Sequence, residues 1–240
     1  MDPLSTDDYL RQRLEPRAGD PVFLHLLDLR DALRPFGSNK ALTILDYGCG
    51  GSPYRGLFPN AIYHRADHPS TSGIDFPITD DSLLSNLSDG SYDLVLSTQV
   101  LEHVPQVQVY LTEAHRLLKP GGHLLLTTHG TYQDHACPHD YWRWTAEGLQ
   151  AELMRAGFTI NHTVRLTCGL RAGVFLFGQL VRWTNKKHLG LRIILKLLRS
   201  IVSPLEAIAD RLTKKEAIET TELKNSIRLS IGLLVQATKS

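Results

Sequence analysis

The sequence predicts an α/β fold built around a mostly parallel β-sheet. The central observation is the stretch 42–53, LTILDYGCGGSP, where a short apolar run ends at Asp46 and opens into a glycine-rich turn. An apolar run of this length bounded by glycines is typical of a buried strand in a parallel sheet. Further apolar runs over 61–66, 91–99 and 123–128 alternate with helical patterns, which favours a doubly wound arrangement.

The composition is that of an ordinary soluble globular protein, with 42% hydrophobic and 21% charged residues among 240. The N-terminal residues MDPLSTDDYL are acidic and lack the apolar core of a secretory signal. The longest nearly apolar run, 172–181, is too short to span a bilayer. Three cysteines lie far apart without paired spacing, so we expect reduced thiols in a cytoplasmic protein.

The net charge of +1 conceals a strongly basic segment. From Leu153 through Leu205 there is no Asp or Glu, whereas the same window holds nine Lys and Arg residues. Such a bias predicts an anionic partner, which could be a phosphorylated substrate, a membrane surface or nucleic acid. The alternative is that these basic side chains only form solvated helix faces.

The remaining elements follow in order along the chain. Residues 5–34 are expected to form two helices. A helix over 106–118 ends at the turn 119–122, KPGG, because glycine and proline stop helices. A further helix is expected over 146–156, followed by a strand over 158–165.

Acidic residues at the ends of the first two strands predict a cofactor site. Asp67 lies 21 positions after Asp46, the distance that one helix and one strand should occupy. An acidic side chain there can accept hydrogen bonds from both hydroxyls of a ribose. Gly48 and Gly50 let the backbone approach a ligand closely. A dinucleotide site would need a third glycine where Pro53 stands, so NAD and FAD are disfavoured.

Four segments resemble the S-adenosyl-L-methionine (SAM)-dependent methyltransferases. They are the D-x-G-x-G pattern from Asp46 to Gly50, the strand end at Asp67, the run YDLVLSTQVLEHV and the run LLKPGGHLLLTT. The resemblance covers roughly residues 41–165 and implies a Rossmann-like, seven-stranded methyltransferase sheet with SAM as cofactor. It further implies that Asp75 meets the adenine amino group and that Gln99 touches the cofactor. The predicted cofactor-binding residues are Asp46, Gly48, Gly50, Asp67, Asp75 and Gln99.

The loop over 129–145, HGTYQDHACPHDYWRWT, is predicted to bind the acceptor, because it follows the fifth strand at the carboxyl edge of the sheet. Its PHDYWRWT segment resembles a subgroup of small-molecule or glycan-related methyltransferases. A hydroxyl nucleophile must lose a proton, and histidine is the usual base near neutral pH. The candidate catalytic residues are His129, His135 and His139, which the sequence does not rank firmly, with Asp140 as an orienting partner.

Two alternatives apply to this loop. His135, Cys137 and His139 alternate as in a metal site, but zinc sites usually need a fourth ligand and other spacings, so no metal is predicted. Trp142 and Trp144 can be anchors that pin the loop on the sheet rather than surfaces on which a substrate stacks.

A basic helical insertion is predicted at 167–225, before a last strand near 229–239. Its helices are expected over 173–183, 189–201 and 205–215, and the second has an apolar and a basic stripe. Such a helix can be a lid, a homodimer interface or a peripheral membrane contact. Nucleic acid is disfavoured because no aromatic residues are interleaved with the basic ones. The expected division is residues 1–40 as an N-terminal helical segment, 41–166 with 226–240 as the cofactor-binding core, and 167–225 as the insertion.

These patterns together predict a cytoplasmic SAM-dependent methyltransferase, which could also be peripheral at a membrane. Its acceptor is expected to be a small molecule that is methylated on a hydroxyl oxygen and is anionic, sugar-linked or lipid-linked. The alternatives are a non-catalytic SAM-binding scaffold or partner subunit, or a methyltransferase-fold enzyme without net methylation, such as a cyclase. The identity of the acceptor cannot be read from the sequence.

Overall fold

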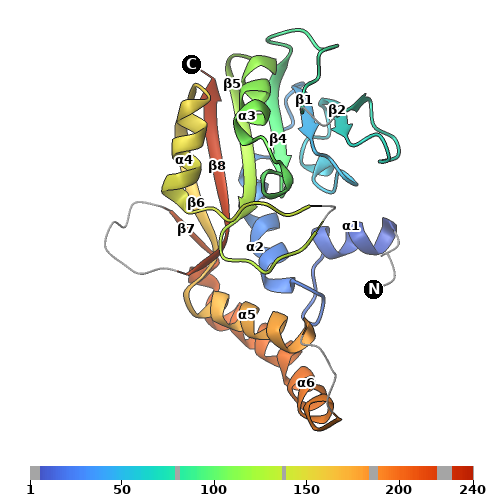
Figure 1. Cartoon of the computed structure of the whole chain (residues 1–240), viewed down its shortest axis with the longest axis vertical. Helices are drawn as coiled ribbons and strands as arrows, with labels where there is room; N and C mark the ends of the chain where they lie inside the picture. Colours follow the sequence, from blue (N-terminus) through green and yellow to red (C-terminus); the bar gives the residue numbers. More distant parts are fainter. Residues whose placement is uncertain (1–5, 79–81, 137–138, 184–188, 221–228, 240) are drawn as a thin grey trace.

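A mixed sheet of eight strands runs through the chain in the order β3-β2-β1-β4-β5-β8-β6-β7 (Figure 1). The computed structural model describes residues 6–78, 82–136, 139–183, 189–220 and 229–239. The strands are β1 (Thr43–Tyr47), β2 (Ile62–Asp67), β3 (Phe76–Pro77), β4 (Tyr92–Thr98), β5 (Leu118–His129), β6 (Phe158–Cys168), β7 (Ile218–Thr220) and β8 (Ser230–Lys239). The helices are α1 (Thr6–Leu14), α2 (Phe23–Leu33), α3 (Val107–Leu117), α4 (Ala146–Arg155), α5 (Gly169–Trp183) and α6 (Leu189–Leu212). Short 3-10 turns are η1 (Arg34–Phe36), η2 (Arg55–Leu57), η3 (Leu101–His103) and η4 (Lys214–Glu216).

The five strands β1 to β5 are mutually parallel, and β8 inserts antiparallel between β5 and β6. This arrangement confirms the predicted seven-stranded Rossmann-like sheet and places the predicted last strand as β8. The additional strand, β7, is three residues long and pairs antiparallel with the edge strand β6. The sequence did not predict it because three residues are too few to show a strand pattern.

Apolar side chains on both faces of the sheet explain why it lies between helical layers. Leu45 and Val95 are buried in one core with residues of α3 and α4. Ile44 and Leu96, their neighbours along the same strands, are buried in a second core with residues of α2. Burial on both faces is why the strands have nearly continuous apolar runs. The carboxyl ends of the parallel strands face α1 and the α5–α6 hairpin (Figure 1).

Several element boundaries differ from those expected. α6 is one helix that continues through Pro204, where two separate helices were expected. Its inward side chains Leu195, Val202 and Ala209 remain buried on both sides of the proline, so packing maintains the helix where one backbone hydrogen bond is lost. β5 already begins at Leu118, so the KPGG residues form the irregular start of a strand and not a turn.

A buried ion pair anchors the α5–α6 hairpin to the rest of the chain. The Arg171 guanidinium of α5 donates to both carboxylate oxygens of Asp28 in α2, at 2.8 and 2.6 Å. Both side chains are almost fully buried, at 1% and 2% exposed. Thr167 donates a hydroxyl hydrogen bond to Asp28, and Asp210 of α6 accepts from Arg171 at 3.0 Å. One network therefore joins α2, α5 and α6.

Candidate active site

The glycine turn after β1 has a backbone that requires glycine. Gly48 has a φ of +80°, and a Cβ there would lie 2.6 Å from the methyl groups of Val100. The N–H groups of Gly48 and Cys49 both donate to the Ala66 carbonyl, which ties the turn to β2. Gly50 also has a positive φ, and its N–H donates to the Asp67 carboxylate. The turn therefore exposes backbone close to the acidic end of β2.

Asp46 is a buried carboxylate beside this turn. It is 2% exposed, and one oxygen accepts a hydrogen bond of 2.7 Å from the Tyr63 hydroxyl. Its other oxygen has no hydrogen-bond partner within the described part of the chain. Burial raises the pKa of Asp46 to about 7, although the Tyr63 hydroxyl lowers it. A buried carboxylate oxygen without a partner fits a cationic group of a ligand, such as the ammonium of SAM.

Asp67 and Asp75 both interact with the backbone around β2. The Asp67 carboxylate accepts from the N–H groups of Gly50 and His68. Asp75 is exposed, immediately precedes β3, and accepts from the Arg65 N–H at 2.7 Å. Asp75 therefore lies at the start of β3, next to the end of β2.

Two further residues, which the sequence analysis did not name, lie beside the expected cofactor site. The Arg65 guanidinium donates to the Gly50 carbonyl at 2.8 Å and to the Ser52 hydroxyl at 2.9 Å, so it fixes the glycine turn. Tyr9 of α1 lies over the same turn, since a Cβ on Gly51 would be 2.8 Å from its ring. α1 therefore covers the turn where the cofactor is expected, as Figure 1 shows for the helix as a whole.

Gln99 connects the cofactor side to a second group of polar side chains. It follows β4 with a φ of +57°, a conformation that non-glycine residues adopt mainly where the surrounding structure imposes it. Its amide oxygen lies 3.1 Å from Nε2 of His25, and its amide nitrogen donates to the Thr127 hydroxyl at 3.2 Å. The side chain is therefore held between β5 and α2.

The second group, which we call the histidine cluster, consists of His25, Glu102, His129, Tyr132 and His135. The His129 ring stacks on Tyr132 with centroids 3.9 Å apart, and its centroid lies 5.5 Å from that of His25 and 4.9 Å from that of His135. Glu102 is fully buried, and one of its oxygens is 3.0 Å from Nε2 of His129. These residues come from α2, η3, the end of β5 and the following loop, so only the fold brings them together.

Burial sets the protonation of the histidine cluster. It lowers the pKa of His25 to about 4 and that of His129 well below its usual value, so both rings are neutral at pH 7. It raises the pKa of Glu102 to about 7, against the lowering effect of the hydrogen bond from the Thr128 hydroxyl. The Nδ1 atom of His129 has no hydrogen-bond partner among the residues described. The pair therefore holds a buried, unpartnered ring nitrogen, while the other ring nitrogen lies 3.0 Å from a Glu102 oxygen that has no hydrogen-bond partner among the described residues.

The loop after β5 is held by an ion pair within itself. Asp140 accepts two hydrogen bonds from the Arg143 guanidinium, at 2.7 and 2.6 Å, and one from the His135 N–H at 2.8 Å. The Arg143 hydrogen bonds hold the pKa of the Asp140 carboxyl far below its ordinary value. Asp140 therefore positions His135 and does not itself accept a proton. The side chain of His139, the third candidate histidine, is exposed and lies near the ring of Tyr141.

Residues 21–162 match a family model described as a methyltransferase domain, which covers more than half of the chain. The chain belongs to this methyltransferase family. It is 33% identical over 105 residues to the ubiquinone biosynthesis O-methyltransferase of Caulobacter vibrioides, a match that covers 37% of this chain and 41% of that relative. The chain thus spans less than half the length of the curated relatives that head the comparison.

Solved structures share the fold along nearly the whole chain. A SAM-dependent methyltransferase from Thermotoga maritima, described as a possible histamine N-methyltransferase, superimposes with a TM-score of 0.57 at 16% identity, over 98% of this chain and 95% of that one. The cyclase SpnF superimposes with a TM-score of 0.55 at 17% identity, over 92% and 83%. At such low identity these similarities show the fold alone.

The methyltransferase chain also brings together three side chains of types that bind metal ions. Ligand atoms of Glu102, His103 and His135 all lie within 4.8 Å of one another. The Nδ1 atom of His103 is 2.6 Å from the His139 carbonyl oxygen. The other ring nitrogen of His103, Nε2, is therefore the one available toward Glu102 and His135. Cys137, the middle residue of the H-x-C-x-H pattern, lies outside the described residues.

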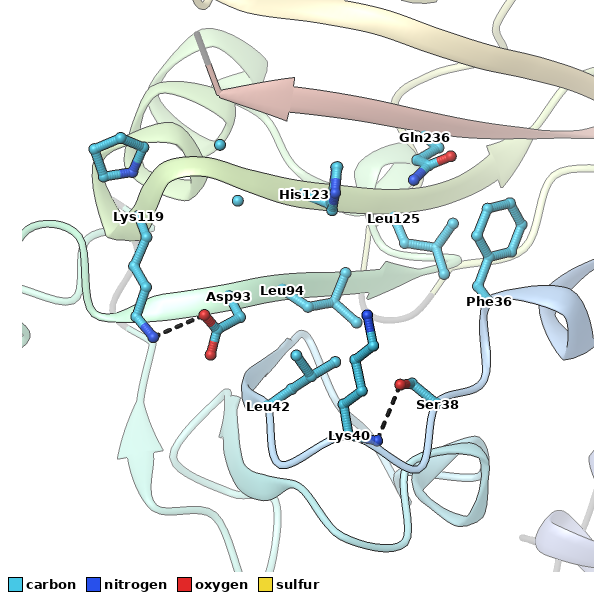
Figure 2. A pocket seen from close by; sticks show the side chains of 13 residues that line it. Phe36, Ser38, Lys40, Leu42, Asp93, Leu94, Lys119, His123, Leu125 and Gln236 are labelled. Carbon is cyan, nitrogen blue, oxygen red and sulfur yellow. Dashed lines mark hydrogen bonds and ion pairs between the residues drawn. The ribbon is translucent and has the colours of Figure 1, made fainter.

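A cavity of about 370 Å³ lies at the opposite edge of the methyltransferase sheet. Figure 2 shows its floor of Leu42, Leu94 and Leu125, with Lys119 bonded to Asp93 at 2.7 Å on its rim. These residues stand at the amino ends of the parallel strands, whereas ligands of such sheets bind at the carboxyl ends. The cavity is therefore separate from the glycine turn and the histidine cluster.

Proposed function

We propose that the protein transfers the methyl group of SAM to a hydroxyl oxygen of a small-molecule acceptor. The observation that carries this proposal is the buried contact of 3.0 Å between Glu102 and His129 at the carboxyl edge that also holds the glycine turn. Membership in the methyltransferase family supports SAM as the methyl donor. The carboxylate oxygen of Asp46 that has no described hydrogen-bond partner fits a positive charge of SAM. The base needed for a hydroxyl acceptor is supplied by His129.

SAM supplies a methyl group already activated by a sulfonium, so the protein's task is to position the acceptor and accept its proton. Neutral His129 takes the hydroxyl proton on its free Nδ1 atom. Glu102 then stabilises the imidazolium ring that forms, and burial strengthens that interaction. Tyr132, stacked on His129, holds the ring in orientation.

The aromatic side chains packed around the histidine cluster support an acceptor with a flat or apolar part. The ring of Phe175 in α5 lies 6.1 Å from His25 and 5.7 Å from Tyr132, centroid to centroid. Such aromatic surfaces favour planar or hydrocarbon groups. A relative named for ubiquinone biosynthesis supports an acceptor with a phenolic ring and a lipid tail.

Replacing Asp67 with alanine is expected to weaken SAM binding by about 10- to 100-fold, because charge-assisted hydrogen bonds are each worth about 1.5–3 kcal/mol. Isothermal titration calorimetry with the full chain measures this directly. Asp89→Ala is the matched control, since Asp89 precedes the amino end of β4, where it pairs with Arg116 of the last turn of α3, and its loss should leave affinity unchanged. Equal affinity of wild type and Asp67→Ala would contradict the cofactor assignment.

Release of S-adenosylhomocysteine separates the proposal from its alternatives. A methyltransferase given catechols and phenols with prenyl tails should release this product in step with a methylated acceptor. A non-catalytic scaffold, a partner subunit or a cyclase would bind SAM and release no S-adenosylhomocysteine.

The proposed division into residues 1–40, 41–166 with 226–240, and 167–225 is tested separately, by limited proteolysis at those boundaries.

Dialysis against EDTA is expected to leave methyl transfer unchanged. A sulfonium donor needs no Lewis acid, and the proposed base, His129, contacts Glu102 directly. Rates before and after dialysis, measured with the same acceptor, check this. Loss of activity that Zn²⁺ or Mn²⁺ restores would instead place a metal among Glu102, His103 and His135.

A further inference from the structure

α6 has two apolar faces, of which only one is packed against other described residues. Leu195, Val202 and Ala209 are at most 5% exposed and lie on the inner side, which packs on α5 and the body. The other face consists of large aliphatic side chains spaced three or four residues apart. We call this the outer face; it comprises Ile193, Leu197, Ile201, Leu205, Ile208 and Leu212.

The outer face is unusually apolar for a surface helix. Its six side chains range from 36% exposed at Leu205 to 79% at Leu212. They extend along nearly all of a 24-residue helix, which is about 36 Å long at 1.5 Å per residue. Single exposed leucines are common, but a contiguous row of this length marks an interaction surface. No helix in the described ranges is both long enough and apolar enough to cross a membrane.

The charged side chains next to the outer face are basic. Lys196 and Arg211 of α6 are exposed, and Lys214 and Lys215 follow the helix and are exposed as well. The acidic residues of α6 are neutralised on the inner side. Glu206 is fully buried against Arg182 at 2.7 Å, and Asp210 accepts from Arg171. Among the described side chains of α6, the exposed charges are therefore all positive.

We propose that the outer face of α6 docks on an anionic lipid bilayer, with the helix lying in the plane of the interface. The aliphatic row would enter the acyl boundary while the lysine and arginine side chains contact lipid phosphates. A second copy of the chain fits less well, because a symmetric contact would bring the exposed basic groups of two α6 helices together without described acidic partners. Figure 1 shows the α5–α6 hairpin projecting beyond the sheet, which leaves α6 free to meet a surface.

The hairpin also connects this surface to the histidine cluster. Phe175 of α5 packs beside His25 and Tyr132, while α6 packs on the same helix. A lipid-linked acceptor could therefore pass from the bilayer to the cluster along α5. The docking proposal itself rests on the outer face alone and does not require methyl transfer.

Co-sedimentation of the full chain with vesicles tests the proposal. Vesicles of phosphatidylcholine with phosphatidylglycerol should retain the protein, and phosphatidylcholine alone should retain much less. The variant Leu197→Glu/Ile201→Glu is expected to bind anionic vesicles at least tenfold more weakly. Met154→Glu is the matched control: this apolar side chain is 57% exposed on α4, and its replacement should leave binding unchanged.

A second variant leaves the aliphatic row intact. Lys196→Ala/Arg211→Ala should weaken binding to anionic vesicles by about 25-fold at low salt, because each basic group near the surface contributes roughly fivefold. Circular dichroism confirms that each variant is folded. Equal binding to neutral and anionic vesicles, or no binding to either, would overturn the proposal. So would light scattering that shows a wild-type dimer converted to a monomer by Leu197→Glu/Ile201→Glu, since the outer face would then be a self-interface.

Discussion

Replacing His129 with asparagine is expected to lower kcat by about 10²- to 10⁴-fold, the usual contribution of a general base. Asparagine keeps a polar group in the space but cannot accept the hydroxyl proton. Affinity for SAM should be unchanged, because the described ring contacts of His129 lie within the histidine cluster. Steady-state rates and calorimetry on the same preparation separate the two effects.

The matched control is His123→Asn, six residues earlier on β5, where the side chain is exposed and hydrogen-bonds Thr238. Its rate should equal that of the wild type. His135→Asn and His139→Asn complete the comparison among the three candidate bases. A full loss in His135→Asn or His139→Asn with an active His129→Asn would assign the base to another residue.

The contact between Glu102 and His129 also predicts how the rate depends on pH. Glu102 must be ionised to stabilise the imidazolium ring of His129, and burial raises the pKa of Glu102 to about 7. Below that pH the carboxyl group is protonated, so the rate should fall as pH decreases through 7 and rise as pH increases. Glu102→Gln should be slow across the range and lack this rise. A wild-type profile that is flat from pH 6 to 8 would contradict the role of Glu102.

The sequence predicted the parts of the fold whose signals are local. Asp46 and Asp67 could be placed at the ends of strands because an apolar run and a turn define each end within a few residues. The strands β1, β4 and β5 could be located along the chain from the same kind of pattern. In contrast, continuity of α6 through Pro204 depends on packing against α5, which no local pattern records.

The candidate site was predictable only where it lies on one segment. His129, His135 and Asp140 belong to a single loop that follows a recognisable strand. His25 has no local signal of a site in the sequence, and only the fold brings it to Gln99. Tyr9 could not be identified because its contact with the glycine turn joins residues about forty positions apart.

Asp28→Ala is expected to destabilise the chain by about 3–5 kcal/mol, because removing one partner of a buried ion pair leaves the other charge without compensation. Arg171 would keep Asp210 but lose its two bonds to Asp28, and Thr167 would lose its acceptor. For a chain of this size such a loss lowers the melting temperature by about 6–20 °C. Urea denaturation followed by circular dichroism measures the free energy of unfolding.

Asp31→Ala provides the comparison on the same helix. Asp31 pairs with Arg30 and Arg34 at the partly exposed side of α2, so its removal should cost no more than about 1 kcal/mol. The double variant Asp28→Leu/Arg171→Met removes both charges and replaces them with apolar groups. If desolvation of a single charge is the cause, this variant should recover most of the lost stability. A double variant as unstable as Asp28→Ala would instead show that the hydrogen-bond geometry joining α2, α5 and α6 is what holds the hairpin in place.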